Sequence, residues 1–426
     1  MEKKNVFAIM LCSMSMAMAT SCGNEDTNFL SEVKEQQTPN RLTEAQSAEI
    51  GRGINAFSLR ALSTMASKEK GTSKVFAPVG AASVLAMLND GAAGSTRQEL
   101  MSLLGCKEAT TEALNEFFKG LTTTSLPTTE TTRLTLANAV FVSQGQELNP
   151  VFASDMESCY EADIDKLDFH SPVAVDHINS WCSQKTQGMI PRFLETVKPN
   201  WSAVLLNAFY FNGKWKTPFI CEFTTETAFL REDGTQTVVP MMAMDTHNAS
   251  KNEYYETASY QALRMDYGEG SYAMTFILPK QGSATCSDVL NALTADEWQE
   301  LCSKLNVPEG MLAINLPRFS VENGVEDNGS LAGTLQDMGA TSILGDNACY
   351  PNVLVHSGLR LLDICQKAVV SVTEEGTEAA SSTGAWAASD PGQAPKPIFF
   401  RADHPFLFVI SNKATGLIYL IGTYQG

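Results

Sequence analysis

The sequence predicts an α+β fold, because helical patterns come first and strand patterns dominate later in the chain. Apolar side chains recur at helical spacing over residues 43–66, and the pattern returns at 79–88 and 95–104. Later segments are rich in β-branched and aromatic residues, and the last two, at 406–412 and 417–424, are joined through a turn-forming NKATG. We therefore expect helices packed on large, mostly antiparallel sheets.

The chain from residue 43 to residue 426 is expected to form a single large body. No internal repeat and no Pro/Ser-rich linker divides it. The formal net charge of −18 at pH 7 argues against a nucleic-acid partner, because a phosphate backbone would repel such a surface. We expect a monomer with an acidic surface.

Residues 1–21 have the pattern of a secretory signal peptide. Lys3 and Lys4 precede an uncharged, methionine-rich apolar stretch, and small residues lead to Cys22. The apolar stretch is too short to span a membrane. A cysteine at this place resembles the lipobox of bacterial lipoproteins, which implies acylation of Cys22. The alternative is an ordinary signal peptide that is cut near Ser21.

Residues 22–42 are polar and acidic, with too little apolar surface to form a core. We expect them to be a flexible tether, so that the protein meets a membrane only through its lipid anchor. The expected localisation follows from the signal: export across the inner membrane, then lipid anchoring at the bacterial outer membrane or cell surface.

The cysteine and histidine positions indicate neither a disulfide framework nor a metal site. Cys12 and Cys22 precede the expected body, and the other eight cysteines are scattered without a C-x-x-C pair: Cys106, Cys159, Cys182, Cys221, Cys286, Cys302, Cys349 and Cys365. We expect mostly buried thiols that pack as small hydrophobic side chains. The five histidines are equally dispersed.

The common catalytic motifs G-x-S-x-G, H-E-x-x-H and the P-loop are missing from the sequence. We therefore expect a protein that is not an enzyme and that uses no metal and no cofactor. A surface-anchored hydrolase is the alternative, but it would need a catalytic constellation that the sequence does not display.

Six sequence blocks resemble the conserved blocks of the serpin family, in the order in which that family has them. They are INSWCSQKTQGMI (178–190), NAFYFNGKWKTPF (207–219), VPMM (239–242), LPRFS (316–320), EEGTEAASSTG (374–384) and HPFLFVISNKATGLIYLIGTY (404–424). The resemblance covers about residues 43–426. It implies about nine helices, three mostly antiparallel β-sheets and an exposed reactive-centre loop, at about 374–397, that acts as bait for a protease.

The EEGTEAASSTG block is expected to form the hinge and the inserting part of that loop: Glu374, Glu375, Gly376, Thr377, Glu378, Ala379, Ala380, Ser381, Ser382, Thr383 and Gly384. In inhibitory serpins the loop is cleaved, the protease stays attached as an acyl-enzyme, and the loop enters the main sheet as an extra strand. Strand alternation from Thr377 to Ala387 puts six small, uncharged side chains on one face, while Glu378 and Trp386 fall on the other. The pattern avoids the cost of burying an unpaired charge, and Gly376 permits a bend where insertion begins.

The cleaved bond lies among five candidate residues: Ala387, Ala388, Ser389, Asp390 and Pro391. The usual family spacing from Gly376 puts Asp390 before the bond, but the proline after it has no N–H and suits few serine proteases. Cleavage after one of the three small residues would fit a shallow, elastase-like pocket. We favour Ala388 or Ser389, and small-residue-directed serine proteases. Trp386 either engages a more distant subsite or is a partly shielded loop aromatic.

A small polar cluster of Ser, Asn and His, called the shutter, commonly lies beneath the sheet opening of serpins. The matching positions here are Ala77, Asn207 and Gln366. Asn207 is kept, and Gln366 can still donate and accept hydrogen bonds. The missing hydroxyl at Ala77 is expected to change the strength of this network, and with it how readily the sheet opens.

The resemblance implies a suicide-substrate inhibitor of serine proteases, with cysteine proteases as a second target class. The alternative is a non-inhibitory serpin scaffold, which binds a ligand or is cleaved without trapping the protease. Small side chains on the inserting face favour inhibition, because family members that lost inhibition often carry charges, prolines or bulk there.

Overall fold

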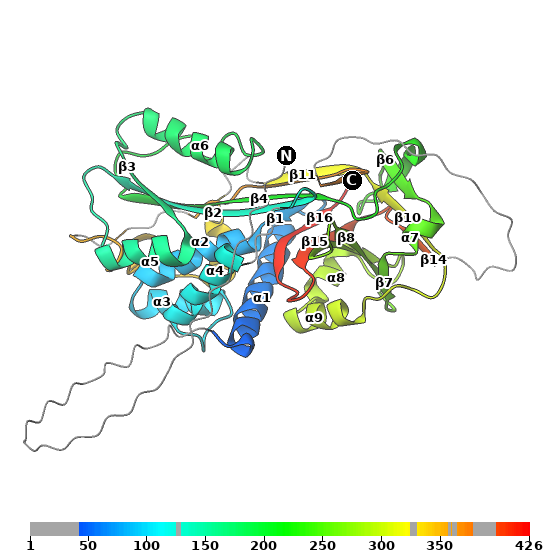
Figure 1. Cartoon of the computed structure of the whole chain (residues 1–426), viewed down its shortest axis with the longest axis horizontal. Helices are drawn as coiled ribbons and strands as arrows, with labels where there is room; N and C mark the ends of the chain where they lie inside the picture. Colours follow the sequence, from blue (N-terminus) through cyan, green and yellow to red (C-terminus); the bar gives the residue numbers. More distant parts are fainter. Residues whose placement is uncertain (1–41, 125–128, 324–329, 357–358, 360–363, 378–397) are drawn as a thin grey trace, which may run out of the picture. The chain divides into compact units, whose positions relative to one another are not determined.

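The computed structural model describes residues 42–426 apart from five internal stretches: 125–128, 324–329, 357–358, 360–363 and 378–397. The described residues form ten α-helices, two short 3-10 helices and sixteen strands, which are arranged in three sheets (Figure 1). Most strand pairs are antiparallel. The predicted α+β architecture is therefore confirmed.

The first helix begins after a residue that caps it, while the helices that begin at Pro78, Gly94 and Val173 have no side-chain cap. The first, α1 (Glu44–Lys68), follows Thr43, whose hydroxyl accepts the Gln46 N–H at 3.2 Å while the Gln46 side chain accepts the Thr43 N–H at 3.0 Å. The other α-helices are α2 (Pro78–Gly91), α3 (Gly94–Leu103), α4 (Thr111–Thr124), α5 (Pro150–Tyr160), α6 (Val173–Lys185), α7 (Thr246–Ala249), α8 (Cys286–Ala292), α9 (Ala295–Lys304) and α10 (Ala332–Asp337), and the 3-10 helices are η1 (Cys221–Phe223) and η2 (Gly345–Asn347). Within the described ranges, no helix combines the length and apolar character needed to cross a bilayer.

Two of the sheets are built mainly from the later part of the chain. The first has the order β1 (Lys74–Phe76), β16 (Ile418–Tyr424), β15 (Phe406–Asn412), β9 (Tyr272–Pro279), β8 (Tyr260–Tyr267) and β7 (Glu253–Glu256), all antiparallel. The second has the order β14 (Ile398–Arg401), β10 (Leu312–Pro317), β6 (Gln236–Met244) and β5 (Thr225–Leu230), with β14 parallel to β10. The hairpin predicted at the end of the chain is β15 and β16.

The third sheet contains the predicted hinge. Its order is β11 (Phe319–Asn323), β12 (Ala368–Val372), β13 (Gly376–Thr377), β4 (Ala203–Lys214), β2 (Thr132–Ser143) and β3 (Asp163–Leu167). The long antiparallel ladder between β2 and β4 runs from Thr132 opposite Gly213 to Val142 opposite Ala203. The strand next to the hinge, β4, is therefore hydrogen-bonded to β2 along nearly its whole length.

Both faces of the third sheet are covered. Side chains on one face join the main hydrophobic core, which includes α1 and α2, while Phe141 and Leu206 on the other face pack with Ile178 and Cys182 of α6. Figure 1 shows α6 on the opposite side of β2 and β4 from α2, α4 and α5. The cover of the second face is partial, because alternate residues of β11 are exposed and those of β12 are only half-buried.

The cysteines match the prediction only in part. In the described chain no disulfide joins them, and four are buried: Cys106, Cys159, Cys182 and Cys286. Burial raises the pKa of the Cys106 and Cys182 thiols to about 12, which keeps them protonated and unreactive. The expectation of burial is wrong for Cys221 and Cys349, which are exposed, because scattered positions do not reveal which neighbours cover a thiol.

Candidate functional site

The predicted hinge enters the third sheet as a strand. Gly376 and Thr377 form β13, which lies between β12 and β4. Their antiparallel partners on β4 are Lys214 and Gly213, and Thr377 also pairs with Val372 of β12. Since β4 has 12 residues and β13 has 2, the hinge strand accompanies only one end of β4. Thr377 is the last described residue before residue 378, and it already lies between β12 and β4.

Gly376 is required by its backbone conformation and by the nearness of β4. Its φ angle is +151°, which L side chains rarely adopt. A Cβ at this position would lie 2.0 Å from the carbonyl oxygen of Gly213, which is far inside van der Waals contact. Any side chain here would push β13 away from β4.

Glu374 anchors the hinge through a buried carboxylate. Its side chain is 5% exposed and pairs with Arg318, whose Nε donates a hydrogen bond at 3.1 Å, while the Thr224 hydroxyl donates another at 2.6 Å. Burial opposes ionisation, but the bonds from Arg318 and Thr224 outweigh it and hold the pKa of the Glu374 carboxyl below its ordinary value. The Glu374 carbonyl also accepts the Phe219 N–H at 2.8 Å. The chain is therefore fixed just before β13 begins.

Two stacked aromatic rings lie against the hinge. The rings of Trp215 and Tyr267 have centroids 4.4 Å apart and are nearly parallel. The Trp215 indole donates to the Thr373 carbonyl at 3.0 Å, and its backbone N–H donates to the Glu375 carbonyl at 2.7 Å. The Tyr267 hydroxyl lies 2.7 Å from the Thr377 hydroxyl. The sequence analysis missed Tyr267, because it belongs to β8 of the first sheet and no local spacing connects it to the hinge.

A cavity lies at the other end of β4, beside the segment that leads into β12. Its volume is about 150 Å³, and its walls come from α2, residues 193–194, residues 200–206 and residues 364–365. Leu205 packs with the main core and Leu206 with the core under α6, and both line the cavity. The cavity therefore passes through the plane of the third sheet, between β4 and residues 364–365.

The three predicted shutter residues take part in two hydrogen-bond groups. Gln366 accepts the Ala77 N–H at 3.2 Å and donates to the Ala77 carbonyl. Asn207 donates instead to the Asn138 side chain at 2.9 Å, and the Ser83 hydroxyl donates to the same oxygen, also at 2.9 Å. A hydroxyl that Ala77 cannot supply is thus present on α2 at Ser83. The sequence analysis missed Ser83 and Asn138, which no motif marks.

The remaining predicted site residues lie outside the described residues. They are Cys22, the loop residues 378–384, and the cleavage candidates Ala387, Ala388, Ser389, Asp390 and Pro391. In the part of the chain that is described, no group of three or more His, Cys, Asp or Glu side chains is placed to hold a metal ion.

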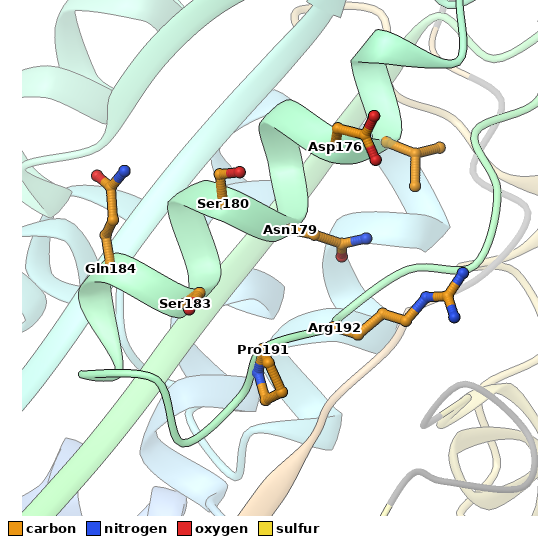
Figure 2. A pocket seen from close by; sticks show the side chains of 8 residues that line it. Asp176, Asn179, Ser180, Ser183, Gln184, Pro191 and Arg192 are labelled. Carbon is orange, nitrogen blue, oxygen red and sulfur yellow. The ribbon is translucent and has the colours of Figure 1, made fainter.

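An open polar groove of about 620 Å³ follows the outside of α6. Figure 2 shows Asp176, Ser180 and Gln184 along the helix and Arg192 on the segment after it, with Asn179 pointing toward that segment. Asn179 accepts the N–H groups of Phe193 and Leu194 at 2.7 and 2.8 Å and donates to the Leu194 carbonyl at 2.9 Å. These bonds from Asn179 fix residues 193–194 to α6. The groove follows from this packing of the segment against the helix.

A two-residue strand, Gly376–Thr377, lies within the third sheet of a three-sheet α+β body, as the resemblance to serpins implies for the fold. The comparisons agree: the model of the family described as serpin (serine protease inhibitor) matches residues 52–425. Iripin-2 of Ixodes ricinus is 31% identical over 383 residues, which cover 88% of this chain and 93% of that protein. The chain belongs to the serpin family.

Two further similarities bear on fold and function. Thyroxine-binding globulin of Rattus norvegicus is 30% identical over 380 residues, covering 87% of each protein. The native-state structure of tengpin, a thermophilic serpin, matches with a TM-score of 0.79 at 24% identity, covering 91% of this chain and 96% of that one. Serpins inhibit proteases in general, but a relative named for binding thyroxine shows that the family name alone does not fix the function.

Proposed function

We propose that this serpin inhibits serine proteases by trapping them as acyl-enzymes while its cleaved loop inserts into the third sheet. The observation that carries the proposal is β13, since Gly376 and Thr377 already form a strand between β12 and β4. A cleaved loop would continue this strand antiparallel to both neighbours. Each added residue would gain backbone hydrogen bonds, which drive insertion.

The side-chain pattern of the loop supports insertion in this register. Thr377 points toward Tyr267 of the first sheet, so that side of the strand faces the core. Alternation would bring the small, uncharged residues 379, 381, 383, 385 and 387 to the same side, with Glu378 and Trp386 on the other. A charge on the core side would cost several kcal/mol, on the order of a buried unpaired ion after relaxation. The sequence avoids that cost.

The chemical step belongs to the protease. Its serine attacks the carbonyl of the residue before the cleaved bond, the amine of the next residue leaves, and an ester joins protease to loop. Insertion then distorts the attached protease before water hydrolyses the ester. We propose small-residue-directed, elastase-like proteases as targets, with Ala388 or Ser389 before the bond; a cysteine protease would form the corresponding thioester.

The test is to incubate residues 42–426 with proteases directed to small, aromatic, basic and aspartate residues. Denaturing gels and intact mass should reveal a covalent complex with the small-residue-directed enzyme, together with a released carboxy-terminal peptide. The first residue of that peptide identifies the bond among residues 387–391. If every protease cleaves the loop and remains active, the trapping proposal is wrong.

A non-inhibitory scaffold is the second candidate, because a thyroxine-binding globulin is among the relatives and an apolar cavity opens in the sheet. The number of loops cleaved per protease inactivated distinguishes a trapping inhibitor from a non-inhibitory scaffold. A ratio near one supports trapping, and a ratio of many supports the scaffold.

We also propose that Cys22 is acylated and that residues 22–42 tether the inhibitor, acting as a monomer, to the bacterial outer membrane or cell surface. The support is the order of signal, cysteine and polar segment in the sequence. In a bacterial expression host, Cys22→Ser should move the protein from the membrane fraction to the soluble fraction. If the unsubstituted chain is already in the soluble fraction and begins at Cys22 without the mass of an acyl group, the lipoprotein proposal is wrong. Residues 1–21 are then an ordinary signal peptide.

A further inference from the structure

We propose that Tyr267 is a positioning residue, whose buried hydroxyl selects a hydroxyl side chain at residue 377 and so holds the start of the inserting strand in the third sheet. The hydroxyl oxygens of Tyr267 and Thr377 lie 2.7 Å apart, although 110 residues separate them in the sequence. Tyr267 lies on β8 of the first sheet and Thr377 on β13 of the third. The bond between them therefore ties the two sheets together at the hinge.

Contacts outside the hinge fix the ring of Tyr267. The Trp215 ring stacks on it with centroids 4.4 Å apart, and the Phe211 ring packs edge-on at 4.9 Å. Gly213 of β4 leaves the space that the ring occupies, because a Cβ there would lie 2.7 Å from Cδ1 of Tyr267. None of these three residues belongs to the hinge. The body of the protein therefore places the hydroxyl, which is ready for a partner before the hinge strand binds.

The Tyr267 hydroxyl needs a hydrogen-bond partner at this place. The residue is 1% exposed, and burial raises the pKa of its hydroxyl, which therefore stays protonated. Within the described residues Thr377 is its one hydrogen-bond partner, and Thr377 is itself buried. A buried hydroxyl that is left without a partner costs more free energy than the hydrogen bond itself contributes. An alanine or valine at residue 377 would leave the tyrosine unpaired, so the site selects threonine or serine.

The bond favours a hinge strand that lies in the sheet over a hinge that is detached. In the sheet, Gly376 lies opposite Lys214 and Thr377 opposite Gly213 of β4. A cleaved loop would continue this pairing, so a molecule whose hinge is already in place begins insertion without delay, a step that rests on the proposed function. A hinge that detaches more often gives water more time to hydrolyse the ester, and the protease is then released rather than trapped.

Hydrogen exchange of the uncleaved chain tests the bond without a protease. Residues 42–426 form one compact unit by themselves and can be studied alone. The Trp215 amide reports on the hinge, because its N–H donates to the Glu375 carbonyl at 2.7 Å and loses this partner when the hinge detaches. Tyr267→Phe and Thr377→Val each delete one hydroxyl and keep the shape of the side chain. In each variant the amide should exchange about five- to tenfold faster, the value of one hydrogen bond.

Further variants distinguish the hydroxyl pair from packing. Thr377→Ser keeps a hydroxyl and should restore most of the protection that Thr377→Val loses. The double variant of Tyr267→Phe with Thr377→Val brings two apolar groups together and leaves no hydroxyl unpaired, so its Trp215 amide should exchange more slowly than that of Thr377→Val alone. Thr275→Val is the matched control, because this threonine is buried on β9 and its hydroxyl has no partner in the described chain. It should leave the exchange of the amide unchanged.

Circular dichroism and thermal unfolding check that each variant is folded, and the valine and serine variants of Thr377 carry the test if Tyr267→Phe unfolds. The proposal is overturned if exchange is unchanged in either folded single variant, or if the serine variant exchanges as fast as the valine variant. It is also overturned if the effects of the two single variants multiply in the double variant, because the two side chains then act independently.

A second measurement separates this inference from the proposed function. With a protease that the unsubstituted chain traps, Tyr267→Phe and Thr377→Val should raise the number of loops cleaved per protease inactivated, while Thr275→Val should not. If the unsubstituted chain traps no protease, the proposed function fails while the exchange result stands. If trapping occurs and both single variants leave the number unchanged, the link between the hydroxyl pair and insertion is refuted.

Discussion

Removing the cation beside Glu374 tests whether a single ion pair holds the hinge in the sheet. Arg318→Met keeps most of the aliphatic stem and deletes the guanidinium. The Glu374 carboxylate, 5% exposed, is then left with the Thr224 hydroxyl as its side-chain donor in the described chain. Glu374→Gln is the partner variant, since the amide keeps an acceptor for Thr224 but carries no charge.

The expected loss is smaller than for a fully buried pair. Removing one partner of such a pair costs about 3–5 kcal/mol, but the Arg318 side chain is 46% exposed, so water replaces part of the interaction. We expect Arg318→Met to lower the free energy of unfolding by about 2 kcal/mol and Glu374→Gln by about 1 kcal/mol. In the double variant the effects should couple by about 1 kcal/mol.

The sign of the pH dependence follows from the pKa of Glu374. That pKa lies below its ordinary value in the folded chain, so the carboxylate contributes stability at pH values above the ordinary pKa of about 4.3. This contribution is lost as the pH falls through the folded pKa. The difference between Arg318→Met and the unsubstituted chain should therefore be large at pH 7 and shrink in acid.

Two measurements check the hinge anchor. Urea unfolding, followed by circular dichroism at pH 7 and in acid, gives the free energies, and hydrogen exchange of the Trp215 and Phe219 amides reports whether the hinge detaches, because they donate to the Glu375 and Glu374 carbonyls. Coupling within experimental error of zero, or an equal loss at both pH values, would refute the reasoning.

Three further predictions concern the same region and the thiols. Gly376→Ala should detach β13 and speed the hydrogen exchange of the amides that face it. Gly145→Ala is the control, because a Cβ there has no atom within 4 Å, and it should leave exchange unchanged. Equal hydrogen exchange in the two variants would contradict the close-approach argument. Thr377→Arg should leave loop cleavage intact but abolish the covalent complex on denaturing gels, and a persisting complex counts against insertion. A thiol reagent should label exposed Cys221 at once and Cys106, with its pKa of about 12, only after unfolding, as mass spectrometry can follow.

The sequence was sufficient for features that depend on neighbours in the chain. β-Branched and aromatic residues on either side of a turn-forming NKATG predicted the last hairpin, and helical spacing of apolar residues predicted α1. For Gly376 the sequence analysis expected a bend, whereas its close approach to the Gly213 carbonyl on β4 is visible only in the structure. The signals for the hairpin, for α1 and for the bend depend only on residues that are close together in the sequence, so they can be recognised without knowing the tertiary contacts.

Features that join distant segments could not be predicted in this way. Tyr267 meets Thr377 across 110 residues, and Ser83 meets Asn138 across 55. The cavity draws its walls from segments as far apart as residue 84 and residue 365. Nothing in the spacing of these residues indicates contact, because their proximity results from the packing of two sheets and a helix.

The short length of β13 has a consequence for concentrated solutions of this protein. Among the described residues, only Gly376 and Thr377 pair with the 12-residue β4 on its β12 side, and a strand edge that is paired over two residues can template another strand of suitable pattern. The loop of a second copy has the same alternation as the chain's own loop. Such an exchange is head-to-tail, so it would produce linear chains of molecules wherever successive rotations do not close a ring, and their growth would rise with protein concentration.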